Sequence, residues 1–173
     1  MTASTLRRVP DISIESLSKK GWFFVIQNVV IVLWLGVCAV QDIRQRQIAN
    51  ELTLGVGLLA LIYLLWVGST WLGAPRSDGG LALVLALVLT LPGYALGRFG
   101  AGDVKLLAAL GLASNTEYLL GSLIGAAIAM LAWTLMHQWL SSSPIERVGQ
   151  ASTKQPFAPF VLTGFAGCWA WIH

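Results

Sequence analysis

Two aspartates stand where apolar segments of this chain begin or end, and they are the residues best suited to chemistry. Asp103 lies in the run Gly100-Ala101-Gly102-Asp103-Val104-Lys105 at the mouth of one apolar segment, and Asp42 closes another. Placing an ionisable side chain within the membrane costs free energy, so such a residue is by default a candidate functional residue. Two carboxylates that share a proton supply base and acid to one water molecule. The sequence therefore predicts a two-aspartate hydrolytic site that needs no metal and no cofactor.

The residues around Asp103 suit the approach of a peptide chain. Gly100 and Gly102 permit a tight turn and leave the backbone free of Cβ atoms, and a helix start favours the ionised form of Asp103. Simpler interpretations remain open, with Asp42 as a solvated boundary charge and the glycine run as an ordinary turn. Lys105 is interpreted as an anchor or an electrostatic partner, not as a catalytic group.

The composition of the chain indicates that lipid is its solvent. Of the 173 residues, 56% are hydrophobic and 11% are charged, whereas a soluble domain has roughly 25% charged residues. The net charge of +3 is ordinary for a membrane protein and gives no argument for a nucleic-acid partner. The two cysteines match no zinc spacing and are interpreted as packing residues.

Charge-free stretches near or above the ~20 residues that cross ~30 Å of hydrocarbon occur five times. A sixth crossing results when the apolar run 106–116 is extended back to Phe99, which places Asp103 inside the mouth of a helix. The sequence thus predicts an all-α integral membrane protein, a bundle of six transmembrane helices. The expected helices are 21–40, 52–72, 81–96, 99–115, 118–140 and 157–172.

One domain is expected after a short tail. Residues 1–20 form a polar, basic N-terminal tail without the pattern of a cleavable signal, and residues 21–173 form the six-helix domain. Within it, Gly121 and Gly125 are four residues apart on one helix and allow close approach of a second helix. Packing inside the bundle is favoured over dimerisation through these glycines.

Three stretches of the chain resemble the type IV prepilin peptidases, the membrane aspartic peptidases that process prepilins. The run 100–105 matches their Gly-x-Gly-Asp motif. Residues 42–50, which begin with Asp42 and end in Ile-Ala-Asn, match the first-aspartate motif, which ends in Ile-Pro-Asn. Residues 156–160, Pro-Phe-Ala-Pro-Phe, are similar to the Pro-Phe-Gly-Pro-Phe segment that opens the last helix. Order and spacing agree, so the resemblance covers about residues 25–172.

The resemblance implies a reaction, a substrate and a location. Asp42 and Asp103 would be the catalytic pair, facing the cytoplasm from the bacterial inner membrane. The substrates would be prepilins or pseudopilins, cut after a short basic leader and just before a hydrophobic helix, with the pilus assembly machinery as a further partner. Motif residues expected near the approaching substrate are Gly100, Gly102, Lys105 and Asn50.

Two departures from the family pattern refine this expectation. Ala49 stands where the motif has proline, which is expected to loosen the loop after Asp42 without removing a reacting group. The larger bifunctional members carry an extra cytoplasmic domain that methylates the new N-terminus, whereas the loop 41–51 here has only eleven residues. We therefore expect a peptidase without methyltransferase activity, similar to the short enzymes of tight-adherence (Flp-type) pilus systems.

Two alternatives belong to other classes of protein. A catalytically silent assembly subunit of a pilus or secretion apparatus would tolerate the loss of either aspartate. A small ion-coupled transporter would use the aspartates to bind its ion, although such sites usually lie near the membrane midplane.

Overall fold

The computed structural model describes residues 14–97, 99–140 and 156–172, and the regular structure of these residues is helical. A single bridge between Ser69 and Pro75 is the exception. The expected all-α class is therefore confirmed. The helices are α1 (Ile14–Gln45), α2 (Asn50–Val67), α3 (Arg76–Ala95), α4 (Ala101–Ala113), α5 (Thr116–Leu140) and α6 (Ala158–Ile172).

Four of these helices are long and apolar enough to cross a membrane, namely α2, α3, α5 and the part of α1 from Gly21 onward. The other two are shorter. At ~1.5 Å per residue, the 13 residues of α4 and the 15 residues of α6 span roughly 20 and 22 Å, less than a ~30 Å hydrocarbon core. The expectation of six crossings is thus supported for four helices. The two short helices are the ones that begin within the glycine run 100–105 and within the proline–phenylalanine segment 156–160.

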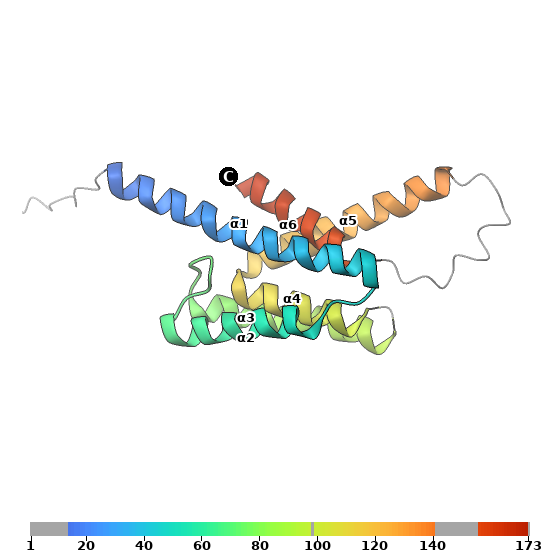
Figure 1. The fold of residues 1–173 in the computed structure, drawn as a ribbon, viewed down its shortest axis with the longest axis horizontal. Helices are drawn as coiled ribbons and strands as arrows, with labels where there is room; N and C mark the ends of the chain where they lie inside the picture. The colour runs from blue at the N-terminus through green and yellow to red at the C-terminus, as the bar shows by residue number, and fades with distance from the viewer. Residues whose placement is uncertain (1–13, 98, 141–155, 173) are drawn as a thin grey trace, which may run out of the picture.

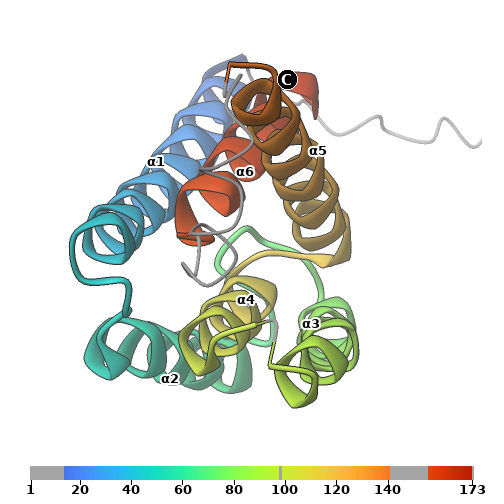
Figure 2. The ribbon, with the colours of Figure 1, turned by 90° about the vertical axis from the view of Figure 1, so that its right-hand side faces the viewer.

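The six helices form two layers of three (Figures 1 and 2). In one layer α6 packs between α1 and α5, and in the other α4 packs between α2 and α3, while α5 also contacts α3 and α4. Each short helix is therefore flanked by two long ones. The C-terminal end of α1 and the starts of α2, α4 and α6 lie at the same end of the bundle, on the right in Figure 1.

Glycines allow the close contact between α5 and α6. A Cβ added to Gly125 would lie 2.6 Å from the Cα of Gly164, and one added to Gly164 would lie 2.8 Å from the backbone nitrogen of Ala126. A Cβ on Gly121 would overlap the Cys168 side chain. Gly121 and Gly125 therefore serve packing within the bundle, which is the use that the sequence favoured for them.

Several helix boundaries differ from the sequence expectation, and local backbone chemistry explains them. α1 runs on to Gln45, so Asp42 lies inside its last turn and the connection to α2 is only residues 46–49. α2 ends earlier than expected because Gly68 adopts a left-handed conformation (φ 79°) and caps the helix at the Leu64 carbonyl. α3 begins at Arg76, directly after Pro75, so the glycine-containing stretch 76–80 is helical.

Candidate functional site

Asp42 caps the start of α6 from the neighbouring helix. Its side chain is 6% exposed, and its Oδ2 accepts a 2.9 Å hydrogen bond from the N–H of Ala158, the first residue of α6. Helix starts leave backbone donors without partners inside the helix. Here Pro159 has no N–H, and the next two N–H groups bond to the carbonyl of Phe157. Asp42 thus satisfies the remaining donor of the first turn of α6.

Asp103 is the third residue of α4 and holds the start of its own helix. Its Oδ2 accepts a 3.0 Å hydrogen bond from the N–H of Gly100, the N-cap residue, which is one half of a capping box. A carboxylate in the first turn also interacts favourably with the helix dipole. Asp103 therefore lies inside the helix mouth, as expected, and is half-buried. Both aspartates are held by a backbone N–H at the start of a short helix.

The glycine run contacts the connection that follows Asp42. A Cβ on Gly102 would lie 3.5 Å from the Cβ of Ile48 and 3.7 Å from its backbone nitrogen. A Cβ on Gly100 would lie 3.2 Å from Oδ2 of Asp103. The missing side chains therefore let the connection and the carboxylate approach the start of α4, and two of the three motif stretches meet here.

Lys105 and Asn50, both expected near the substrate, are paired with each other. The Nζ of Lys105 donates a 2.7 Å hydrogen bond to Oδ1 of Asn50, the first residue of α2. The bond lies on an exposed part of the molecule and joins the fifth residue of α4 to the first residue of α2. Lys105 thus connects α4 to α2 through the Asn50 amide.

The third motif stretch meets the glycine run through two aromatic rings. The ring centroids of Phe99 and Phe157 are 5.1 Å apart and their planes are 87° apart, an edge-to-face contact. All three stretches are therefore connected at one end of the bundle. The one sequence feature that pointed to Phe99 is its position directly before the N-cap residue Gly100.

The residue that replaces the motif's proline makes a bond that proline cannot make. Ala49 has φ −58° and ψ 133° as the N-cap of α2, and its φ is close to the value of about −65° that a proline ring imposes. Its N–H donates a 3.2 Å hydrogen bond to Oε1 of Gln41. A hydrogen bond thus holds the connection after Asp42 against α1, at the position where the motif has a proline ring. No motif in the sequence marks Gln41 for this contact.

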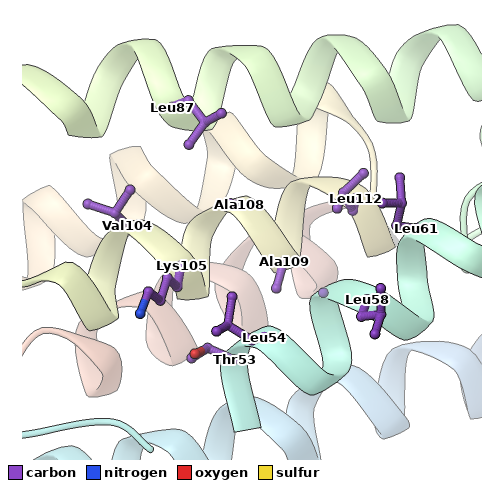
Figure 3. Close-up of a pocket in the computed structure, with 11 residues that line it drawn as sticks. Thr53, Leu54, Leu58, Leu61, Leu87, Val104, Lys105, Ala108, Ala109 and Leu112 are labelled. Carbon is purple, nitrogen blue, oxygen red and sulfur yellow. The ribbon is translucent and has the colours of Figure 1, made fainter. Parts of the chain in front are cut away.

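An apolar groove of about 300 Å³ lies beside these residues. It is lined by α2 and α4, with Leu87 of α3 at its edge (Figure 3). Its lining is aliphatic apart from Thr53 and Lys105, and neither aspartate belongs to it. The carboxylates and the groove are therefore separate features, with Lys105 at the border of the groove.

The site chemistry consists of carboxylates, backbone N–H groups and one ammonium group. Within residues 14–97, 99–140 and 156–172, no group of three or more His, Cys, Asp or Glu side chains is placed to hold a metal ion. Asp42, bonded at the start of α6, and Asp103, at the start of α4, have the functional groups needed for general acid and base steps.

The helices and the four candidate spans define a multi-pass helical membrane protein. Residues 29–135 match the type IV leader peptidase family. The match covers more than half of the chain and both aspartates, so the chain belongs to this family and is a peptidase, which confirms the resemblance seen in the sequence. No curated protein and no solved structure matches the chain.

Proposed function

We propose that the protein is a membrane aspartic endopeptidase that removes the basic leader of Flp-type prepilins at the cytoplasmic face of the inner membrane. Its family supports leader cleavage. The observation that carries the two-aspartate mechanism is the equivalent placement of Asp42 and Asp103. Each accepts a backbone N–H at the start of a short helix, and the two segments touch through Ile48 and Gly102.

In this mechanism the two carboxylates share one proton. The ionised aspartate removes a proton from water, whose oxygen attacks the scissile carbonyl carbon, while the protonated aspartate donates its proton to the carbonyl oxygen. In the collapse of the tetrahedral intermediate, the protonated carboxyl donates its proton to the leaving nitrogen, the ionised carboxylate takes a proton from a hydroxyl of the intermediate, and the C–N bond breaks. The pair returns to its starting state with one proton. Gly100 and Gly102 let the Asp103 carboxylate and the connection after Asp42 come close to the start of α4.

The short connection after Asp42 supports a peptidase without a methyltransferase unit. Only four residues, 46–49, separate the end of α1 at Gln45 from the start of α2 at Asn50. The proposed substrate is therefore a prepilin whose new N-terminus leaves the enzyme unmethylated, as in tight-adherence pilus systems. The lipid bilayer and the pilus assembly machinery are the further partners.

Co-expression with a Flp-type prepilin tests the proposal through the mobility shift that loss of the leader causes. Wild type is expected to cleave, and Asp42→Asn and Asp103→Asn are each expected to abolish cleavage while remaining in the membrane. Asp78→Asn is the matched control, because Asp78 accepts a hydrogen bond from Thr116 at the start of α5. This control is expected to cleave normally.

Retained cleavage in either active-site variant would contradict the two-aspartate mechanism. Failure of wild type to cleave a panel of Flp-type prepilins would contradict the proposed substrate. The silent subunit would then be supported by pilus assembly that persists in both Asp→Asn variants.

A further inference from the structure

Two phenylalanines stand directly before the residues whose N–H groups hold the aspartates. Phe99 precedes Gly100, whose N–H donates to Oδ2 of Asp103 at 3.0 Å. The same arrangement recurs at the other carboxylate, since Phe157 precedes the residue whose N–H donates to Asp42 at 2.9 Å.

The two rings close a continuous path between the carboxylates. The path runs from one aspartate through a hydrogen bond to its helix start, across the edge-to-face contact of Phe99 and Phe157, and through the second helix start to the other aspartate. We infer that Phe99 and Phe157 are positioning residues that set the separation and relative orientation of Asp42 and Asp103. This inference rests on the proposed function, because two-aspartate hydrolysis requires both carboxylates to reach one water molecule.

The layered fold explains why such a tie is needed. α4 and α6 belong to different layers, which are connected mainly through α5. A displacement of one layer against the other would separate the two helix starts and their carboxylates. The ring contact joins the layers at the end of the bundle where both aspartates lie. An aromatic side chain suits this role because it is rigid and has few rotatable bonds.

Gly93 of α3 fixes the position of Phe99. The N–H of Phe99 donates a 3.1 Å hydrogen bond to the Gly93 carbonyl, and a Cβ on Gly93 would overlap the Phe99 ring. The ring therefore rests directly on the backbone of α3. Any side chain at position 93 would push Phe99 away from its present place beside Phe157.

Substitutions that remove the ring contact but keep an apolar side chain test the inference. Phe99→Leu and Phe157→Leu are each expected to lower kcat about 10- to 100-fold with little change in KM, because small misplacements of reacting groups cost about this much. Phe99→Tyr and Phe157→Tyr keep the ring and are expected to retain activity. The double Leu variant is expected to be no worse than the poorer single variant, since both substitutions remove the same contact.

Two glycines of α3 provide a test variant and its control. Gly93→Ala is expected to lower kcat in the same way as Phe99→Leu. Gly80→Ala in α3 is the matched control, because its added Cβ meets nothing within 4 Å. Unchanged kcat in both Leu variants, or losses that multiply in the double variant, would overturn the inference.

Hydrogen exchange gives a readout that needs no substrate. In Phe157→Leu the Gly100 amide is expected to exchange faster, and in Phe99→Leu the Ala158 amide is expected to exchange faster, each across the ring contact. Acceleration confined to the mutated side would overturn the inference. If wild type cleaves no prepilin, the proposed function fails, while the exchange measurement still decides whether the rings couple the two helix starts.

Discussion

Asp42 has a structural partner in addition to its proposed chemical role, and the two can be separated by substitution. Asn at position 42 keeps an oxygen that accepts the Ala158 N–H, whereas Ala leaves this buried donor without a partner. An unsatisfied buried donor costs about 1–3 kcal/mol. Both variants are therefore expected to lose cleavage, and only Asp42→Ala is expected to lose stability by this amount, measured as the free energy of unfolding in detergent. Equal stability of the two variants would contradict the capping role.

The connection after Asp42 offers a second test at single residues. Ala49 already has the φ that proline requires, so Ala49→Pro is expected to fold and to retain cleavage, although it removes the hydrogen bond to Gln41. Gln41→Leu is expected to destabilise the wild-type chain by about 0.5–1.5 kcal/mol, the net value of one hydrogen bond. In the Ala49→Pro background the same substitution should have almost no effect. A double-mutant cycle of unfolding free energies measures this coupling. Additive effects of the two substitutions would show that Gln41 does not stabilise the chain through its bond to the Ala49 N–H.

At the scale of helices, the α5–α6 contact determines where the start of α6 lies. A Cβ on Gly164 would overlap backbone atoms of α5 at Ser122 and Ala126, and backbone atoms cannot move aside cheaply. Gly164→Ala is therefore expected to destabilise the bundle by about 1–3 kcal/mol, as overpacking does. It is also expected to reduce cleavage, because α6 carries the N–H that holds Asp42.

Gly167→Ala is the matched control on the same helix. Its added Cβ meets nothing within 4 Å, so thermal unfolding and cleavage should match wild type. A Gly164→Ala variant as stable and active as Gly167→Ala would contradict the tight packing of α5 on α6.

The elements themselves were largely predictable because hydrophobic length is a local property of the sequence. All six segments are helical, and Asp103 falls in the first turn of its helix, as the extension of the apolar run predicted. Boundaries were less predictable, since the left-handed cap at Gly68 and the helical start at Arg76 depend on backbone conformation. The continuation of α1 past Asp42 was missed because charged residues there suggested a loop.

The contacts of the site were not predictable from the sequence. The bond from Asp42 to Ala158 joins residues 116 positions apart, and the Phe99–Phe157 contact joins two helix starts in different layers. Hydrophobic periodicity carries information only within one helix. The spacing of the motifs indicates candidate residues, but it does not indicate which of them are in contact. The sequence therefore singled out both aspartates as candidate site residues, but it did not indicate the backbone donors bonded to them or the ring contact between the two helix starts.

At the scale of the whole molecule, the orientation of the bundle in the membrane decides whether the two aspartates lie on the same side as the leader peptide of the substrate. At the end of the bundle where both aspartates lie, here the site end, Arg44 and Arg46 are exposed at the end of α1 and Lys105 lies near the start of α4. The short connection at the opposite end leads to Arg76, and Lys19 and Lys20 lie near the start of α1 on that side. An excess of basic residues in short loops favours the cytoplasm. A basic leader that precedes a membrane-inserted helix is cut on the side where it resides, so the proposed reaction requires the site end to be cytoplasmic.

Cysteine labelling in spheroplasts measures this orientation. In a background with Cys38 and Cys168 replaced by alanine, Gln47→Cys reports the site end and Ser77→Cys reports the opposite end, since both positions are exposed. A membrane-impermeant maleimide is expected to label Ser77→Cys in intact spheroplasts and Gln47→Cys only after lysis. The reverse pattern would place Asp42 and Asp103 on the outer face, away from any cytoplasmic leader. Cleavage by this protein would then require a substrate exposed outside the cell membrane, and the prepilin assignment would fail even if both aspartates were essential.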